Sequence, residues 1–168
     1  MSEIQDSGTR REFETGAVRD MPDGKGRFDL MPLDVVADIV AITDTNFIEI
    51  INCEHAFLTF MKLGLVDGNY WSFVNACETF IKLRGWSAPE AMLEVAIHFE
   101  DGARKYGENN WQKGIPISSY VDSAYRHYFK WKCGLNDERH DRAVLWNLMC
   151  AAWTVVHRPD TPQNSSVS

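Results

Sequence analysis

The fold of this chain is decided by the run Ala143-Val-Leu-Trp-Asn-Leu-Met-Cys-Ala-Ala-Trp153, which is apolar on every side of a helix. A helix without a polar face must be covered by other elements, so this run predicts the central helix of the fold. Asn147 is the exception within it, and a buried amide requires hydrogen-bond partners. The helix is expected to open at Asn136-Asp-Glu-Arg-His-Asp141, because acids favour its positive end.

Apolar residues at three- and four-residue steps predict further helices before this run. No stretch shows convincing strand alternation, and the sequence contains no internal repeat. We therefore expect an all-α fold, a compact bundle of about five helices. The further helices are expected between Pro32 and Gly64, with a break near Thr43–Asn46, between Trp71 and Gly85, and between Ser118 and Gly134.

The clearest helix start is Ser87-Ala-Pro-Glu90, which has a serine N-cap, a proline in the first turn and a glutamate that completes a capping box. The helix that follows carries one apolar stripe and one polar stripe. A polar stripe is usually the solvated side of a helix, so its chemistry alone does not establish a site. The polar stripe contains Glu90, Glu94, His98, Asp101 and Lys105.

Residues 1–31 are polar and interrupted by glycines, which predicts an irregular arm. Within it, Gly24-Lys25-Gly26-Arg27 is a weak signal for anion binding, because glycines let the backbone approach an anion that the two bases neutralise. A solvated tail explains the same composition equally well. We expect a helical domain over residues 32–156 and a disordered tail over 157–168.

Charge and composition narrow the classes of partner. The formal net charge of −7 argues against binding to duplex nucleic acid or to an anionic membrane. No apolar run approaches the roughly 18 residues of a membrane span, and the first residues lack the pattern of a signal peptide. The four cysteines show neither zinc nor redox spacing. We therefore expect a cytoplasmic protein.

Acids and histidines fall together on the predicted helices. Besides the stripe above, Glu138-x-x-Asp141 lies at the head of the last helix, and carboxylates from facing helices can hold Mg²⁺. His98, His127 and His140 belong to the same helices, where they are suited to bind a metal or orient a water. The sequence has no phosphate-binding P-loop and no nucleophile motif, so attack of water on a metal-bound phosphate is the leading chemistry.

Several blocks of this sequence are similar to one known family. They are Thr15-Gly-Ala-Val-Arg-Asp20, Gly24-Lys-Gly-Arg-Phe-Asp-Leu30, Gly102-Ala-Arg-Lys-Tyr-Gly107, Asn110-Trp111, Arg126-His127 and Trp146-Asn147. Together they resemble the phage dATP/dGTP diphosphohydrolases, which are MazG-like all-α nucleotide pyrophosphohydrolases. The resemblance covers the arm and roughly the C-terminal half, and residues 34–85 match nothing.

The resemblance implies a hydrolase that acts on purine deoxynucleoside triphosphates. It implies cleavage between the α and β phosphates of dATP, dGTP or both, with Mg²⁺ as cofactor and Mn²⁺ as a substitute. The products are a deoxynucleoside monophosphate and pyrophosphate, within a phage pathway for DNA that contains 2-aminoadenine. It also implies a dimer or tetramer in the host cytoplasm.

The metal motifs of the wider superfamily, Glu-Glu-x-x-Glu and Glu-x-x-Asp, are only partly matched. Glu138-x-x-Asp141 fits the second motif in letters, but alignment on the following apolar run places His140 and Ala143 at the acidic positions instead. The first motif is incomplete, because His98 stands four residues after Glu94. The comparison with the two motifs therefore leaves open which individual residues bind the metal.

We hypothesise three sets of site residues, with the arm folded over the site. The candidate catalytic residues are Glu94, His98, Asp101 and His127. The candidate metal ligands are Glu94, His98, Asp101, Glu138, His140 and Asp141. The candidate substrate-binding residues are Arg19, Lys25, Arg27, Lys105, Tyr106, Asn110, Trp111, Arg126 and Asn147.

Two other functions fit parts of the same pattern. One is a helical phage protein that binds a nucleotide or a partner without hydrolysis. The other is an HD-type triphosphohydrolase built around His127 and His140, which would release inorganic triphosphate and a nucleoside.

Overall fold

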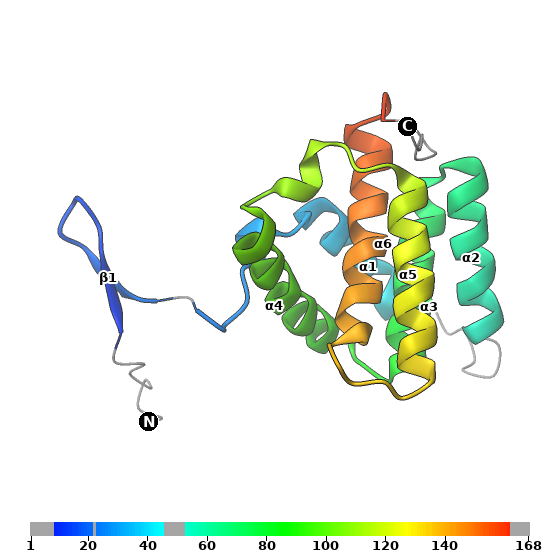
Figure 1. Ribbon diagram of the computed structural model, residues 1–168, viewed down its shortest axis with the longest axis horizontal. Helices are drawn as coiled ribbons and strands as arrows, with labels where there is room; N and C mark the ends of the chain where they lie inside the picture. The colour runs from blue at the N-terminus through cyan, green and yellow to red at the C-terminus, as the bar shows by residue number, and fades with distance from the viewer. Residues whose placement is uncertain (1–8, 22, 46–52, 162–168) are drawn as a thin grey trace.

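Six α-helices build the protein in the computed structural model, which describes residues 9–21, 23–45 and 53–161 (Figure 1). The all-α fold expected from the periodicity is confirmed. The helices are α1 (Leu33–Thr45), α2 (Cys53–Asp67), α3 (Tyr70–Arg84), α4 (Ala88–Tyr106), α5 (Ile117–Lys132) and α6 (His140–His157), with 3₁₀ turns η1 (Phe28–Leu30) and η3 (Asn110–Lys113).

Helix α6 is central, as its apolar sequence predicted. It packs against α5, α3, α4 and α1, while α2 lies on the outer side of α3 and α5 (Figure 1). The buried amide of Asn147 donates from Nδ2 to the Ala143 carbonyl oxygen at 2.8 Å. That bond lies within α6 and satisfies part of the amide without a partner from another helix.

The helix boundaries follow local chemistry. Both bonds of the capping box between Ser87 and Glu90 are present at the start of α4. Gly85 ends α3 in the left-handed conformation, with φ of +77°, which a glycine adopts without strain. The start of α6 differs from the prediction, because the helix begins at His140 and residues 136–139 form the preceding loop. Three residues of the predicted break near Thr43–Asn46 still belong to α1, which ends at Thr45, and residues 46–52 lie outside the described part of the chain.

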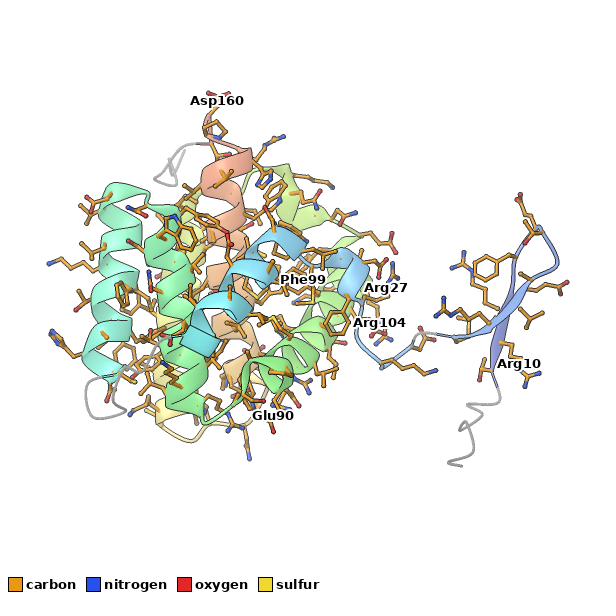
Figure 2. All side chains as sticks on the ribbon, turned by 180° about the vertical axis from the view of Figure 1, so that it is seen from behind. Arg10, Arg27, Glu90, Phe99, Arg104 and Asp160 are labelled. Atoms are coloured by element: carbon orange, nitrogen blue, oxygen red, sulfur yellow. The ribbon has the colours of Figure 1, made fainter. Side chains whose placement is uncertain are left out.

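The arm contains a hairpin that the sequence did not predict. Strands β1 (Arg10–Glu12) and β2 (Val18–Asp20) pair antiparallel and project from the helices (Figure 1). Figure 2 shows Arg10 on this hairpin and Arg27 at the surface of the helical body. Strands of three residues are too short for a visible alternation pattern, which explains the miss. Residues 1–8, 22 and 162–168, including most of the predicted tail, lie outside the described residues.

The second half of the arm is attached to α4 through Glu100, a buried residue. Its two carboxylate oxygens accept hydrogen bonds from the backbone N–H groups of Gly24 and Gly26, each at 2.8 Å. Gly26 also approaches α4 so closely that a Cβ there would lie 2.9 Å from the Cβ of Ala96. The glycines thus admit an anion, as the sequence suggested, but that anion is a carboxylate of the same chain.

We expect Glu100→Ala to loosen the attachment of this segment. The substitution removes the acceptor of two backbone N–H groups, and the loss of about 1–3 kcal/mol corresponds to roughly 5–150-fold faster amide exchange. Hydrogen–deuterium exchange of the peptide that contains Gly24 and Gly26 measures it. Glu108→Ala is the matched control, because the exposed Glu108 bonds to the side chain of Arg27 in the arm and not to the backbone N–H groups of the glycines. Equal exchange in both variants would contradict the role of Glu100.

Candidate active site between α4, α5 and α6

A groove of about 450 Å³ lies where α4, α5 and α6 meet. Side chains that are far apart in the sequence line this groove. On α4 and on α6, the lining residues include pairs that are four residues apart. Most of the residues proposed from the polar stripe and the last two helices line it. The lining residues are His98, Asp101, Gly102, Lys105 and Tyr106 from α4, Ser123 and His127 from α5, Glu138 and Arg139 from the loop, and Arg142, Trp146 and Asn147 from α6.

His98 lies at the base of the groove and packs against the ring of Trp146, with ring centroids 5.9 Å apart. Burial lowers the pKa of His98 to about 4, and the nearby carboxylates of Asp101 and Glu138 only partly oppose this effect. His98 is therefore neutral at pH 7. A neutral imidazole can accept a proton, accept a hydrogen bond or bind a metal.

The low pKa of His98 predicts a loss of stability in mild acid. An unfolded histidine has a pKa near 6.5, so the unfolded state binds more protons between pH 6.5 and pH 4. The contribution of His98 is complete above about pH 6.5 and is lost as the pH falls toward 4, with about 2 kcal/mol lost by pH 5. Urea denaturation of His98→Gln at pH 7 and pH 5 should show a smaller decrease than the wild type.

His55→Gln is the control for this experiment, because His55 is exposed on α2 and lies outside the groove. Its change in unfolding free energy between pH 7 and pH 5 should equal that of the wild type. A His98→Gln variant that loses as much stability as the wild type would mean that His98 is not the acid-sensitive group.

Two histidines and a glutamate meet at the α5–α6 end of the groove. The Nδ1 atoms of His127 and His140 are 3.0 Å apart, and Oε1 of Glu138 is 3.5 Å from each of them. His140 is also bonded through Nε2 to Oδ1 of Asp137 at 2.8 Å. Burial lowers the pKa of His127, so this ring too is neutral at pH 7.

Glu94 and Asp141, both proposed as metal ligands and Glu94 also as a catalytic group, do not line the groove. Oε2 of Glu94 accepts from Arg139 at 2.9 Å and from Arg142 at 2.7 Å. The buried Asp141 accepts from Arg84 at 2.9 Å and from Arg139 at 3.0 Å. Guanidinium groups thus supply the positive charge that a metal would bring to these carboxylates, and the assignment of Glu94 and Asp141 as metal ligands stays a prediction.

The same network sets the ionisation of Asp141. Burial would raise the pKa of its carboxyl, but hydrogen bonds from Arg139 and Arg84 outweigh burial and hold the pKa below its usual range. Asp141 is therefore a structural anion that joins the ends of α3 and α6.

Four bases proposed for substrate binding also lie outside the groove. Arg126 is exposed and pairs with Asp122 on the same helix. Arg27 pairs with Asp29 and, at 3.2 Å, with Glu108; these contacts raise the pKa of Arg27. Arg19 and Lys25 line a hollow formed by the hairpin and the following segment. The proposal that the arm folds over the site stays a prediction.

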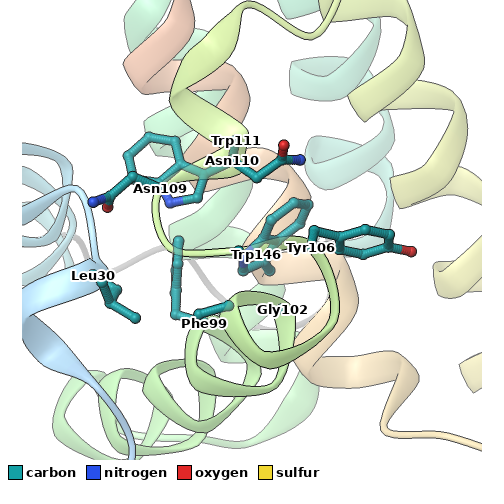
Figure 3. Close-up of a pocket in the computed structure, with 10 residues that line it drawn as sticks. Leu30, Phe99, Gly102, Tyr106, Asn109, Asn110, Trp111 and Trp146 are labelled. Carbon is teal, nitrogen blue, oxygen red and sulfur yellow. The ribbon is translucent and has the colours of Figure 1, made fainter.

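A small apolar pocket adjoins the groove, and Figure 3 shows aromatic rings around it. The pocket and the groove share Gly102, Tyr106 and Trp146. The indole Nε1 atoms of Trp111 and Trp146 are both buried without a hydrogen-bond acceptor among the described residues. Two unpaired donors beside one pocket are suited to a ligand with acceptor atoms in an aromatic ring. Asn110 also lines the pocket, as do Leu30, Phe99, Ala103, Gly107 and Asn109.

Sequence reasoning missed Arg139, Arg142 and Trp146 as groove residues. Arg142 and Trp146 are four residues apart on α6 and therefore share a helical face. This spacing was the available signal, but a tryptophan within an apolar run is more often a core residue. The groove face of α6 became visible only from its packing against α4.

One comparison with known proteins yields a match. A family model described as dATP/dGTP diphosphohydrolase, N-terminal, matches residues 79–164, which is about half of the chain. The matched range includes every residue that lines the groove. No curated protein and no solved structure matches the chain. Among the described residues, no helix has the length and apolar character required to cross a membrane.

Proposed function

The chain belongs to the dATP/dGTP diphosphohydrolase family, and we propose that it hydrolyses dATP, dGTP or both to a deoxynucleoside monophosphate and pyrophosphate. The family indicates a hydrolase. The proposal of a substrate and products rests on the groove, in which carboxylates, neutral histidines and basic side chains lie next to an aromatic pocket. The blocks of sequence quoted above support a role in a phage pathway for DNA with 2-aminoadenine.

The triphosphate is proposed to lie along the basic side of the groove. Lys105 is exposed there, with its Nζ 4.9 Å from the ring centre of Tyr106. Arg139 and Arg142 line the same groove and are held by Glu94. Guanidinium groups fixed by a carboxylate keep further donors for phosphate oxygens, and this local positive charge offsets the overall charge of −7.

The purine is proposed to lie at the mouth of the aromatic pocket, whose cavity of about 20 Å³ has room for no more than an edge of the base. Its ring nitrogens are acceptors, and the unpaired indole N–H groups of Trp111 and Trp146 are donors. Trp146 also lines the groove, as Lys105 does. A nucleotide whose base lies near Trp146 can therefore place its phosphates near Lys105. Aromatic side chains contribute about 1–3 kcal/mol per stacked base.

Trp146→Phe tests this placement, because the substitution removes the indole N–H and keeps an aromatic ring. Loss of one hydrogen bond of about 0.5–1.5 kcal/mol should raise KM for the purine triphosphate by roughly 2–10-fold. Steady-state kinetics with dATP and dGTP measure the change. Trp131→Phe is the control, since Trp131 packs on Phe80 and Tyr128, away from the pocket. An unchanged KM for Trp146→Phe would remove this residue from the base site.

Mg²⁺ is the cofactor that the family resemblance implies, and the groove offers a fitting pair of donors. Mg²⁺ prefers oxygen ligands, keeps several waters and binds through one or two carboxylates together with substrate phosphates. Asp101 and Glu138 are the carboxylates that line the groove, and they are the residues proposed to hold Mg²⁺ or, in its place, Mn²⁺. When bound, this ion would neutralise phosphate charge and favour the ionisation of a bound water.

The side chains of the groove are suited to hydrolysis by water. His98 lines the groove and is neutral at pH 7 because burial lowers its pKa, so it can take the proton of the attacking water. The water oxygen bonds to the α-phosphorus. At the same time the bond from this phosphorus to the oxygen that bridges the α and β phosphates breaks, and pyrophosphate leaves. Lys105 and Arg142 would stabilise the charge that develops on the phosphate oxygens.

Product analysis tests the proposed function. The purified protein is incubated with each deoxynucleoside triphosphate and Mg²⁺, and the products are separated by ion-exchange chromatography. We expect dAMP or dGMP together with pyrophosphate. Inorganic triphosphate with a nucleoside would identify the HD-type reaction instead. Nucleotide binding without any product would identify a non-catalytic binding protein.

Assembly as a homodimer or tetramer remains part of the proposal. Large apolar side chains are exposed where α2 ends and α3 begins, namely Leu63, Val66 and Trp71. Large exposed apolar side chains close together in the chain are candidates for a contact between subunits. Sedimentation equilibrium measures the mass of the assembly, and a mass equal to one chain at micromolar concentration would contradict it.

A further inference from the structure

The triangle formed by His127, Glu138 and His140 has the dimensions of a metal site. Its edges are 3.0 Å between the two Nδ1 atoms and 3.5 Å from each Nδ1 to Oε1 of Glu138. A tetrahedral ion with ligands at about 2.0–2.1 Å has edges of about 3.3–3.4 Å between neighbouring ligands. The three atoms therefore match one face of such a tetrahedron.

The contact between His140 and Asp137 orients the lone pair that a metal needs. A carboxylate oxygen accepts hydrogen bonds, so the 2.8 Å contact to Oδ1 of Asp137 requires the proton of His140 on Nε2. In the neutral ring, Nδ1 then presents its lone pair to His127 and Glu138. A carboxylate behind a histidine in this way is the usual support of a metal-binding imidazole.

A hydrogen bond between the two imidazoles does not account for the position of Glu138. If Nδ1–H of His127 donates to Nδ1 of His140, no proton is left between His140 and the carboxylate oxygen 3.5 Å away. A lone pair and an anion then face each other in a place where the His140 side chain is only 1% exposed. A bound cation removes this repulsion.

Exposure differs among the three side chains in the way that a reactive metal centre requires. The His127 side chain is 17% exposed, the Glu138 side chain is 48% exposed, and both residues line the groove. The nitrogen donors are thus held firmly, while the carboxylate side is open to the groove. Three protein ligands with an open position are characteristic of catalytic zinc sites.

We propose that His127, Glu138 and His140 bind one transition-metal dication of the Zn²⁺ or Co²⁺ class. Imidazole nitrogen suits these ions, whereas Mg²⁺ prefers oxygen ligands in an octahedron. This ion is distinct from the Mg²⁺ proposed to enter with the triphosphate: it uses Oε1 of Glu138, which leaves the other carboxylate oxygen for Mg²⁺. The inference rests on the geometry of the three side chains and does not depend on the proposed hydrolysis.

Co²⁺ binding tests the proposal without any measurement of activity. Metal-depleted full-length protein is titrated with Co²⁺ and followed by visible absorption, in which tetrahedral Co²⁺ absorbs far more strongly than octahedral Co²⁺. We expect one ion per chain with a tetrahedral spectrum, displacement by one equivalent of Zn²⁺, and no displacement by a large excess of Mg²⁺. A weak octahedral spectrum, or displacement of Co²⁺ by Mg²⁺, would overturn the proposal.

Substitution of the proposed ligands tests where the ion binds. His140→Ala and Glu138→Ala should each abolish the tetrahedral spectrum, and Asp137→Ala should weaken Co²⁺ binding about 10–100-fold, as loss of a supporting carboxylate does. Circular dichroism checks folding; if buried His140→Ala does not fold, the more exposed Glu138→Ala decides the matter. His55→Ala, which removes an exposed histidine outside the groove, should keep the wild-type spectrum. A spectrum that persists in Glu138→Ala would place the ion elsewhere.

Discussion

Replacement of Asp101 by asparagine is expected to lower kcat/KM for the deoxynucleoside triphosphate by at least about 100-fold. Asp101 lines the groove on α4, and its side chain is 55% exposed. Its contact with Arg104 is long, at 3.5 Å, so the carboxylate remains accessible to a cation. Asparagine keeps the shape of the side chain but lacks the charge that Mg²⁺ and the attacking water require.

Pyrophosphate release under steady-state conditions, at several concentrations of Mg²⁺, measures this effect. If Asp101 holds the ion, part of the lost activity should return at high Mg²⁺. Asp67→Asn is the matched control, because Asp67 is an exposed carboxylate at the end of α2, outside the groove. Wild-type turnover in Asp101→Asn would remove this residue from the proposed mechanism.

Replacement of Asp141 by alanine is expected to have the largest effect on stability, a loss of about 3–5 kcal/mol in the free energy of unfolding. The carboxylate is buried and accepts hydrogen bonds from Arg84 and Arg139. Removal of the anion leaves these guanidinium groups without their main partner between α3 and α6. Because both arginines remain partly exposed and water can solvate them, the lower end of this range is expected.

The effect of Asp141→Ala should also depend on pH. The folded pKa of Asp141 lies below that of an unfolded aspartate, which is about 3.9. Its contribution is therefore fully present above about pH 4 and is lost as the pH falls through the lower, folded value. Urea denaturation at pH 7 and at pH 3 should show that the difference between wild type and variant shrinks in acid.

Asp122→Ala is the control for the stability experiment. Asp122 and Arg126 also form an ion pair, but both side chains are exposed on α5, so the expected loss is only about 0.3–0.5 kcal/mol. Equal losses in Asp122→Ala and Asp141→Ala would contradict the structural role of the buried carboxylate.

Local sequence predicted much of the fold because the responsible interactions span only a few residues. The capping box at Ser87 and the glycine after α3 lie within one turn of the helix ends that they fix. The polar stripe of α4 was equally visible, since residues at three- and four-residue spacing share a helical face. This spacing brought His98, Asp101 and Lys105 into one groove, as proposed.

The charged partners of the site were not visible in the same way. Glu94 and Asp101 are alike in the sequence, yet Arg139 and Arg142 surround the first while the second lines the groove. Glu100 lies beside Asp101 but is buried under the arm, where it accepts from Gly24 and Gly26. These contacts join residues that are more than 40 positions apart, so no local pattern contains them.

The sequence by itself thus determined an all-α bundle, a central α6 and the helical face that carries the candidate chemistry. Periodicity and capping are properties of a single segment, so they can be recognised without knowledge of its neighbours. Only the tertiary structure decided which carboxylates meet arginines and which meet histidines. An ion pair or a metal site forms only when side chains from different segments come within a few ångströms, and the packing of α4, α5 and α6 sets those distances.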